Sequence, residues 1–266
     1  MSDPATTRAV PGPRSGGTSG TGRTRWSYRW GLLAGTPALR LAALRHAVPS
    51  GSPGRRGCDA CGAPIGLDRP WPALGPTARC GRCRTRVGPP PGAVEAATVL
   101  AVAVLALVGP PVGELVATAW WLGWMVPLVL VDAAVHRLPD RFTAPAALGT
   151  WLLLGVAALT GAGAAPWWRA TAAGLGLGLF FATTTLLLGR RGFGLGDAKL
   201  AVGAGMLLGW YGWVFPVFGL LAACGLAALV AAGLLVAGRV RWSGHLPFGP
   251  FLVLGTVAAL LLATRP

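Results

Sequence analysis

The sequence predicts an all-α polytopic membrane protein, a bundle of about seven membrane-crossing helices preceded by a small cysteine-containing module. Three observations predict this class. The chain has 266 residues, of which 53% are hydrophobic and only 12% charged, and this is too apolar for a soluble domain of ordinary composition. Long apolar runs recur from residue 93 to the C-terminus, and two pairs of cysteines precede them.

The first 49 residues differ from the rest of the chain. Residues 1–29 are predicted to be a disordered basic tail, since Gly, Ser, Thr, Pro and Arg leave little to bury. Residues 30–49 predict either a short amphipathic helix at the membrane surface or a degenerate first membrane helix. Leu32, Leu33, Leu39, Leu41 and Leu44 form its apolar set. Arg40 interrupts that stretch and no cleavage pattern is obvious, so no cleaved signal peptide is predicted.

The net charge of +15 is concentrated near the N-terminus. Residues 1–90 hold 14 of the 23 basic residues, all arginine, with only three acids. These arginines form no clustered helix with interleaved aromatics, so nucleic acid is not expected as a partner. A basic region beside apolar segments instead indicates a cytoplasmic face attracted to an anionic lipid bilayer.

Residues 93–266 are predicted to be the membrane core. The expected spans are 93–109, 114–133, 143–161, 168–189, 197–210, 212–237 and 247–263. Segment 197–210 is short for a crossing, which needs about 20 residues. The glycines of 174–178 permit close helix packing, although a Gly- and Ala-rich composition explains them equally well.

Loop charge predicts the orientation of this core. The loops at 134–142, 190–196 and 238–246 carry basic residues, whereas those at 110–113, 162–167 and 211–212 carry no Lys or Arg. The two kinds alternate, so the N-terminal region and all three basic loops are expected on the cytoplasmic side of the plasma membrane.

Residues 50–92 are predicted to be a cytoplasmic zinc module. Cys58-x-x-Cys61 and Cys80-x-x-Cys83 have the spacing of two tight turns that surround one tetrahedral Zn²⁺. Disulfides are the alternative, but the predicted location is the reducing cytosol. Four cysteine ligands leave no open position, so the expected role of the metal is structural. Cys224, within an apolar run, is interpreted as a small hydrophobe.

Two aspartates stand out in the membrane core. Asp132 ends the apolar run 126–131, and Asp197 lies in the stretch 194–199, Gly-Leu-Gly-Asp-Ala-Lys. A carboxylate at membrane depth costs about 2.5–3.5 kcal/mol on insertion scales, so it indicates a functional site. Asp197 can be interpreted instead as a helix N-cap, but Asp132 lies at a helix C-terminal end, where negative charge is unfavourable. The predicted topology places both aspartates at the cytoplasmic face, as expected for a paired-carboxylate active site.

Neighbouring residues are candidates for supporting this site. Gly194 and Gly196 would let the backbone approach a substrate strand closely. Lys199, the only lysine in the chain, either biases the protonation of the pair or binds substrate backbone; a snorkelling interfacial lysine is the alternative. Asp140 belongs to a basic loop and is interpreted as a turn or N-cap residue.

The run from Asp132 to Leu-Pro-Asp140, followed by Gly-Leu-Gly-Asp197-Ala-Lys199, resembles the bacterial type IV prepilin leader peptidases, which are GxGD-type membrane aspartic proteases. The tandem CxxC module and Glu95 match this family too, and the resemblance covers residues 50 to about 260. It implies that Asp132 and Asp197 are the catalytic pair, and that prepilin or pseudopilin-like leaders are cleaved at the cytoplasmic face before a hydrophobic helix.

Many members of that family also N-methylate the new N-terminus with S-adenosylmethionine. Here the usual first span is replaced by 31–40, which leaves the peptidase core untouched but puts methylation in question. Two alternatives stay open. A presenilin-type intramembrane protease is disfavoured because Val131 precedes Asp132 where a Tyr is usual. A transporter or assembly scaffold would use the aspartates to relay protons or bind a cation, and could hold them far apart.

Overall fold

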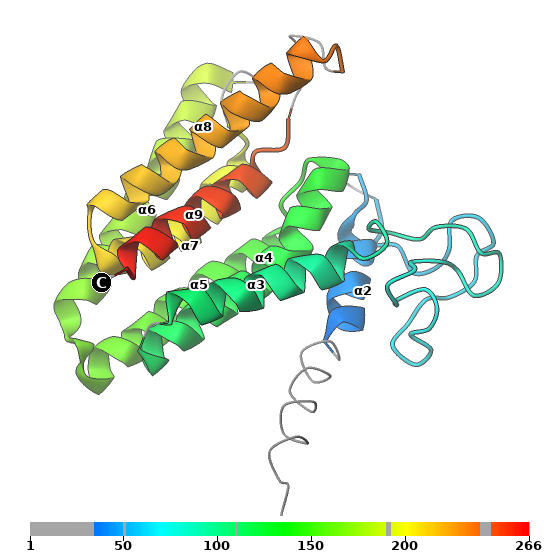
Figure 1. Cartoon of the computed structure of the whole chain (residues 1–266), viewed down its shortest axis with the longest axis horizontal. Coiled ribbons are helices and arrows are strands. Elements are labelled where there is room, and N and C mark those ends of the chain that lie inside the picture. Colours follow the sequence, from blue (N-terminus) through cyan, green and yellow to red (C-terminus); the bar gives the residue numbers. More distant parts are fainter. Residues whose placement is uncertain (1–34, 50–51, 110, 190–192, 240–245, 266) are drawn as a thin grey trace, which may run out of the picture.

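The computed structural model of the chain describes residues 35–49, 52–109, 111–189, 193–239 and 246–265 (Figure 1). This part of the chain is all-helical, as predicted, and its only extended pairings are two isolated bridges, Gly57 with Pro64 and Arg79 with Arg86. The basic tail expected at residues 1–29 lies outside the described residues.

Each of the seven expected spans corresponds to a helical segment. The helices are α2 (Thr36–His46), α3 (Ala93–Val108), α4 (Val112–Val135), α5 (Asp140–Ala157), its extension η1 (Ala158–Ala162), α6 (Ala164–Leu188), α7 (Leu195–Tyr211), α8 (Val214–Val236) and α9 (Gly249–Ala263). By length and composition, α4, α5 with η1, α6 and α8 can each cross a membrane. The apolar helices α3 and α9 are shorter.

Helix α7 is the central helix of the bundle. Twelve of its 17 residues are buried, although it is short for a span. It packs against α6, α5, α9 and α8, and α6 lies closest. Gly174 and Gly178 of α6 make this approach possible, since a Cβ on either would fall 2.4 Å from a side chain of α7. Gly176 faces open space, so only the glycines four residues apart serve helix packing.

Helix packing brings three helix ends together. Helix α4 packs against α5 and α9, and α7 also contacts α9. Helices α8 and α9 are in backbone contact, because a Cβ on Gly255 would lie 2.3 Å from the carbonyl oxygen of Gly219. As a result, the C-terminal end of α4 lies near the N-terminal ends of α7 and α9, and these are the ends that carry the candidate site.

Helix α2 has only 11 residues, too few for a bilayer crossing, and it packs against α3 and α4. Leu41 and Leu44 belong to a hydrophobic cluster with Cys58, Leu74 and Val87 of the following segment. Of its expected apolar set, Leu32 and Leu33 lie outside the described residues. The segment between α2 and α3 extends to one side of the helices (Figure 1, cyan).

Arg40 is fully buried rather than a simple interruption of an apolar stretch. Its Nη2 donates to Oε2 of Glu95 at 2.7 Å, and its Nη1 donates to the carbonyl oxygens of Pro89 and Pro90. A buried charge is stable only when it is paired and hydrogen-bonded. This ion pair therefore ties α2 to the point where the cysteine-containing segment enters α3.

Candidate active site and metal centre

Asp132 lies in the last turn of α4 and is only 4% exposed. Its Oδ2 accepts a hydrogen bond of 3.1 Å from the backbone N–H of Gly249, the first residue of α9. The first N–H groups of a helix have no partner within the helix and carry partial positive charge. The N-terminus of α9 therefore compensates a carboxylate that its own helix does not favour.

Asp197 is the third residue of α7 and is 8% exposed. Its Oδ2 accepts a hydrogen bond of 3.0 Å from the backbone N–H of Gly194, the residue before the helix. This hydrogen bond, from the residue before the helix to the side chain of the third helical residue, is one of the two bonds of a capping box. Asp197 therefore caps the start of α7, although from the third helical position rather than from the N-cap position. The bond occupies only one carboxylate oxygen and does not exclude a chemical role.

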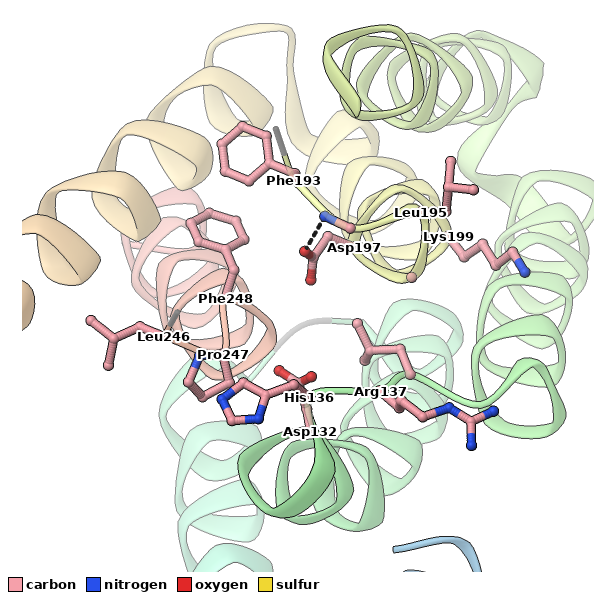
Figure 2. Close-up of a pocket in the computed structure, with 13 residues that line it drawn as sticks. Asp132, His136, Arg137, Phe193, Leu195, Asp197, Lys199, Leu246, Pro247 and Phe248 are labelled. Atoms are coloured by element: carbon pink, nitrogen blue, oxygen red, sulfur yellow. Dashed lines mark hydrogen bonds between the residues drawn. The ribbon is translucent and has the colours of Figure 1, made fainter. Parts of the chain in front are cut away.

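The two aspartates share one cavity of about 570 Å³. Asp132 points into it from α4 and Asp197 from α7, so the two side chains face the same space from opposite walls (Figure 2). The two carboxylates are close enough for their charges to interact. This is the arrangement that a paired-carboxylate site needs, and it differs from a relay whose carboxylates are spread through the bundle.

Residues that the sequence did not single out complete the cavity. Phe193, just before α7, and Phe248, just before α9, line one side and contact each other with ring centroids 4.8 Å apart. Gly249 has no room for a side chain, because a Cβ there would lie 2.6 Å from Oδ2 of Asp132. The sequence signal for this wall is Pro247-Phe-Gly-Pro250, a turn at the start of the last apolar run.

The two candidate glycines have defined contacts. Gly194 supplies the N–H that binds Asp197, and a Cβ on Gly196 would lie 3.0 Å from Cβ of Leu138. Both residues line the cavity. Close packing against Leu138 is therefore a sufficient reason for a glycine at position 196. That the backbone here approaches a substrate strand stays a prediction.

Lys199 and Asp140 form an ion pair, with Nζ 2.5 Å from Oδ1. Both side chains are more than half exposed, as expected for residues at the membrane surface. Asp140 is the first residue of α5, at the helix end where acidic side chains are favoured. Lys199 also lines the cavity that Asp132 and Asp197 share, so the pair joins the start of α5 to the rim of this cavity.

The four cysteines of the two CxxC pairs come together as predicted. Their Sγ atoms all lie within 4.8 Å of one another, and all four thiols are free. The Cys58–Cys83 and Cys61–Cys80 sulfur distances are 3.6 and 3.7 Å. Tetrahedral zinc with Zn–S bonds of about 2.3 Å separates its sulfurs by about 3.8 Å, so these residues fit a zinc ion. Bound there, zinc would crosslink the module.

The two CxxC turns have the same backbone pattern. The N–H of Cys58 donates to the carbonyl oxygen of Ala63, and the N–H of Cys80 donates to that of Thr85. Each acceptor lies five positions after its donor, and each turn has a left-handed residue four positions after its first cysteine, Gly62 and Arg84. Such turns aim both sulfurs of a pair at one point.

Thr85 supports the thiolates directly. Its Oγ1 lies 2.8 Å from the sulfur of Cys83 and 3.4 Å from that of Cys58. Hydrogen bonding from Thr85, helped by backbone N–H groups, lowers the pKa of Cys58 to about 6 and also lowers the pKa of Cys83. Metal binding needs the thiolate form, which this environment favours at Cys58 and Cys83. At Cys61 a backbone hydrogen bond at Ala63 lowers the pKa, but burial and the neighbouring cysteines outweigh it and raise the pKa to about 11.

Comparisons with known proteins agree with this site. The model of the type IV leader peptidase family matches residues 118–259, more than half of the chain. The prepilin leader peptidase/N-methyltransferase of Burkholderia pseudomallei (strain 1026b) is 34% identical over 224 residues, which cover 79% of this chain and 68% of that protein.

The protein of the same description from Aeromonas hydrophila is 32% identical over 185 residues, covering 69% of this chain and 62% of its own. Leader peptidase HopD of Escherichia coli is 36% identical over 131 residues, which cover 48% of this chain and 80% of that protein. No solved structure gives a significant match. The family match, the relatives and the apolar helices together show that the chain belongs to the type IV leader peptidase family and is a membrane protease.

Proposed function

We propose that Asp132 and Asp197 are the catalytic pair of an aspartic endopeptidase. The observation that carries this proposal is that both buried carboxylates face one cavity from different helices. Two carboxylates that share one site hold a single proton between them, because the charge on one opposes ionisation of the other. The cavity is large enough for a segment of extended chain beside them.

In the proposed reaction the ionised carboxylate takes a proton from a water molecule, whose oxygen attacks the scissile carbonyl. The protonated carboxylate gives its proton to the carbonyl oxygen, which forms a tetrahedral diol. As the diol collapses and the C–N bond breaks, the carboxylate that gained the water's proton passes it to the leaving amine. The other carboxylate takes a proton from one diol hydroxyl as the C=O bond re-forms. Each carboxylate is then back in its starting protonation state.

We further propose prepilins and pseudopilin-like proteins as the substrates, because the relatives are named prepilin leader peptidases. An apolar groove of about 230 Å³ between α3, α4 and α9 supports a substrate with an apolar segment next to the cleaved bond. Val129 and Val126 of this groove precede Asp132 on α4, and Pro250 follows Gly249. The groove therefore lies beside the site, along the same two helices.

The proposed location of the site is the cytoplasmic face of the plasma membrane. Arg137 and Lys199 line the cavity, so the end of the bundle that carries the aspartates also carries positive charge. Cytoplasmic loops of membrane proteins are enriched in such residues. A leader that enters this cavity would then approach from the cytoplasm.

N-methylation of the new N-terminus with S-adenosylmethionine is a second proposed activity. It rests on the name of the relatives, prepilin leader peptidase/N-methyltransferase, whose alignments reach beyond the family core. Mass spectrometry of the processed substrate tests it. An added methyl group supports the proposal, and a cleaved but unmodified N-terminus contradicts it.

The peptidase proposal is tested by cleavage of a prepilin in membranes that contain wild type, Asp132→Asn or Asp197→Asn protein at equal levels. Both variants should insert normally and fail to cleave. Asp140→Asn is the matched control, because it removes a carboxylate at the same end of the bundle but outside the cavity lining. Substantial cleavage by either active-site variant would contradict the assignment.

A further inference from the structure

A separate cleft beside α2 is lined by positively charged side chains. Its volume is about 510 Å³, and three parts of the chain enclose it: the end of α2, the start of the cysteine module and the first turn of α5. The lining residues are Arg45, His46, Gly54, Arg55, Arg56 and Arg141. None of these six residues is acidic, so four arginines surround a space without a lining carboxylate.

Little in the described part of the chain neutralises this charge. Nε of Arg55 lies 2.9 Å from Oδ1 of Asp59, in a pair whose aspartate is 71% exposed. Arg45, Arg56 and Arg141 have no carboxylate within ion-pair distance among the described residues. Like charges gathered around a concave surface repel one another and raise the local affinity for an anion.

Packing, rather than chance side-chain placement, builds the cleft. The N–H of Arg55 donates to the carbonyl oxygen of Arg45 at 3.1 Å, and Gly54 lies so close that a Cβ would be 3.1 Å from the same oxygen. His46 bonds through Nδ1 to the carbonyl oxygen of Ala42, and its ring lies 4.6 Å from that of Phe142. These contacts hold the three walls together.

The position of the cleft indicates which anion it meets. Arg141 is the second residue of α5, one of the helices long and apolar enough to cross the membrane. The end of such a helix lies at the level of the lipid head groups. Guanidinium groups at this level bind phosphate through paired hydrogen bonds.

We propose that this cleft binds a phosphate group and that, in the membrane, the phosphate belongs to an anionic phospholipid. The cleft shares no lining residue with the catalytic cavity. The bound lipid would anchor α2 and the zinc module against the membrane core. The proposal is independent of the identity of the peptidase substrate.

The test uses the full-length protein in detergent, with added phosphatidylglycerol or phosphatidylcholine and lipid retention measured by native mass spectrometry. The test variant is R45Q/R141Q. The matched control is R69Q/R86Q, which removes two exposed arginines of the cysteine module that do not line the cleft. Each arginine near an anionic surface strengthens binding about fivefold, so R45Q/R141Q should weaken phosphatidylglycerol retention about 25-fold. The control should change it less than about threefold.

Inorganic phosphate forms a second arm of the experiment. Thermal stabilisation by phosphate that disappears in R45Q/R141Q but persists in R69Q/R86Q would identify free phosphate as a ligand of the same cleft. An equal loss of phosphatidylglycerol in both double variants, or no preference over phosphatidylcholine in wild type, would overturn the proposal. R45K/R141K controls for folding, because it keeps the charge and should retain more lipid than R45Q/R141Q.

Discussion

Gly249 and Asp132 are 117 positions apart in the chain, yet the backbone N–H of Gly249 donates directly to the carboxylate of Asp132. The contact places an acidic side chain from the end of one helix at the start of another. Each helix end thereby gains what it lacks: the carboxylate gains a donor and the first N–H of α9 gains an acceptor.

Gly249→Ala should reduce prepilin cleavage by about tenfold to a hundredfold, because the new Cβ would push the Asp132 carboxylate out of position. The measurement is the initial cleavage rate at equal amounts of inserted protein. Gly225→Ala is the control, since a Cβ on this α8 residue meets no atom within 4 Å. Equal rates for Gly249→Ala and wild type would show that the hydrogen bond does not position the carboxylate.

The double variant Asp132→Asn/Asp197→Asn should lose no more cleavage activity than either single variant. Groups that act as a unit are not additive, because the first substitution already removes the shared function. Rates of the two single variants and the double variant, measured on one prepilin, decide the point. A double variant much slower than both would instead indicate two independent contributions.

Separating Lys199 from Asp140 should have a small effect on folding. Both side chains are more than half exposed, and exposed ion pairs contribute only about 0–1 kcal/mol. Asp140→Asn should therefore keep most of the cleavage activity and change the melting temperature by no more than about 4 °C. If Lys199→Met loses far more activity than Asp140→Asn, Lys199 acts on the substrate or the aspartates in addition to pairing.

The purified protein should contain one zinc per chain, held by Cys58, Cys61, Cys80 and Cys83. Thr85→Ala should weaken zinc binding about tenfold to a hundredfold, because partners of the ligands tune metal affinity to this extent. Competition with a chelator, followed by metal analysis, measures the change. Thr77→Ala is the control: this exposed threonine of the same module donates its hydroxyl to the carbonyl oxygen of Pro72 and has no contact with a cysteine sulfur among the described residues. Protein without zinc that was never exposed to chelator would contradict the assignment.

Val129→Trp should fill the apolar groove beside Asp132 and block substrates that carry a long apolar segment. Cleavage of a full prepilin should fall about fivefold to 150-fold, since forcing the apolar segment into space that the Trp occupies should cost about 1–3 kcal/mol. A short peptide with only the residues around the scissile bond should be cut as by wild type. Val116→Trp, at an exposed position on the same helix outside the groove, is the control. Loss of peptide cleavage as well would show damage to the site rather than to the groove.

Much of this protein follows from local sequence. Apolar runs predicted all seven helices of the core because a membrane helix satisfies its own backbone and needs only an apolar surface. The CxxC pairs predicted the cysteine cluster because three residues of turn determine where both sulfurs point. The sequence alone predicted Asp132 and Asp197 as site residues, because placing a carboxylate at membrane depth costs free energy and so indicates a function.

Other features depend on residues far apart in the sequence, and only the tertiary structure decided them. Arg40 looked like an interruption of an apolar stretch, but folding brings Glu95 to it and permits its burial. Gly249 carries no chemical group that would single it out, and its role exists only because α9 begins at the end of α4. The local sequence shows which polar or charged side chains are costly to bury. Helix packing determines which partner offsets that cost in free energy.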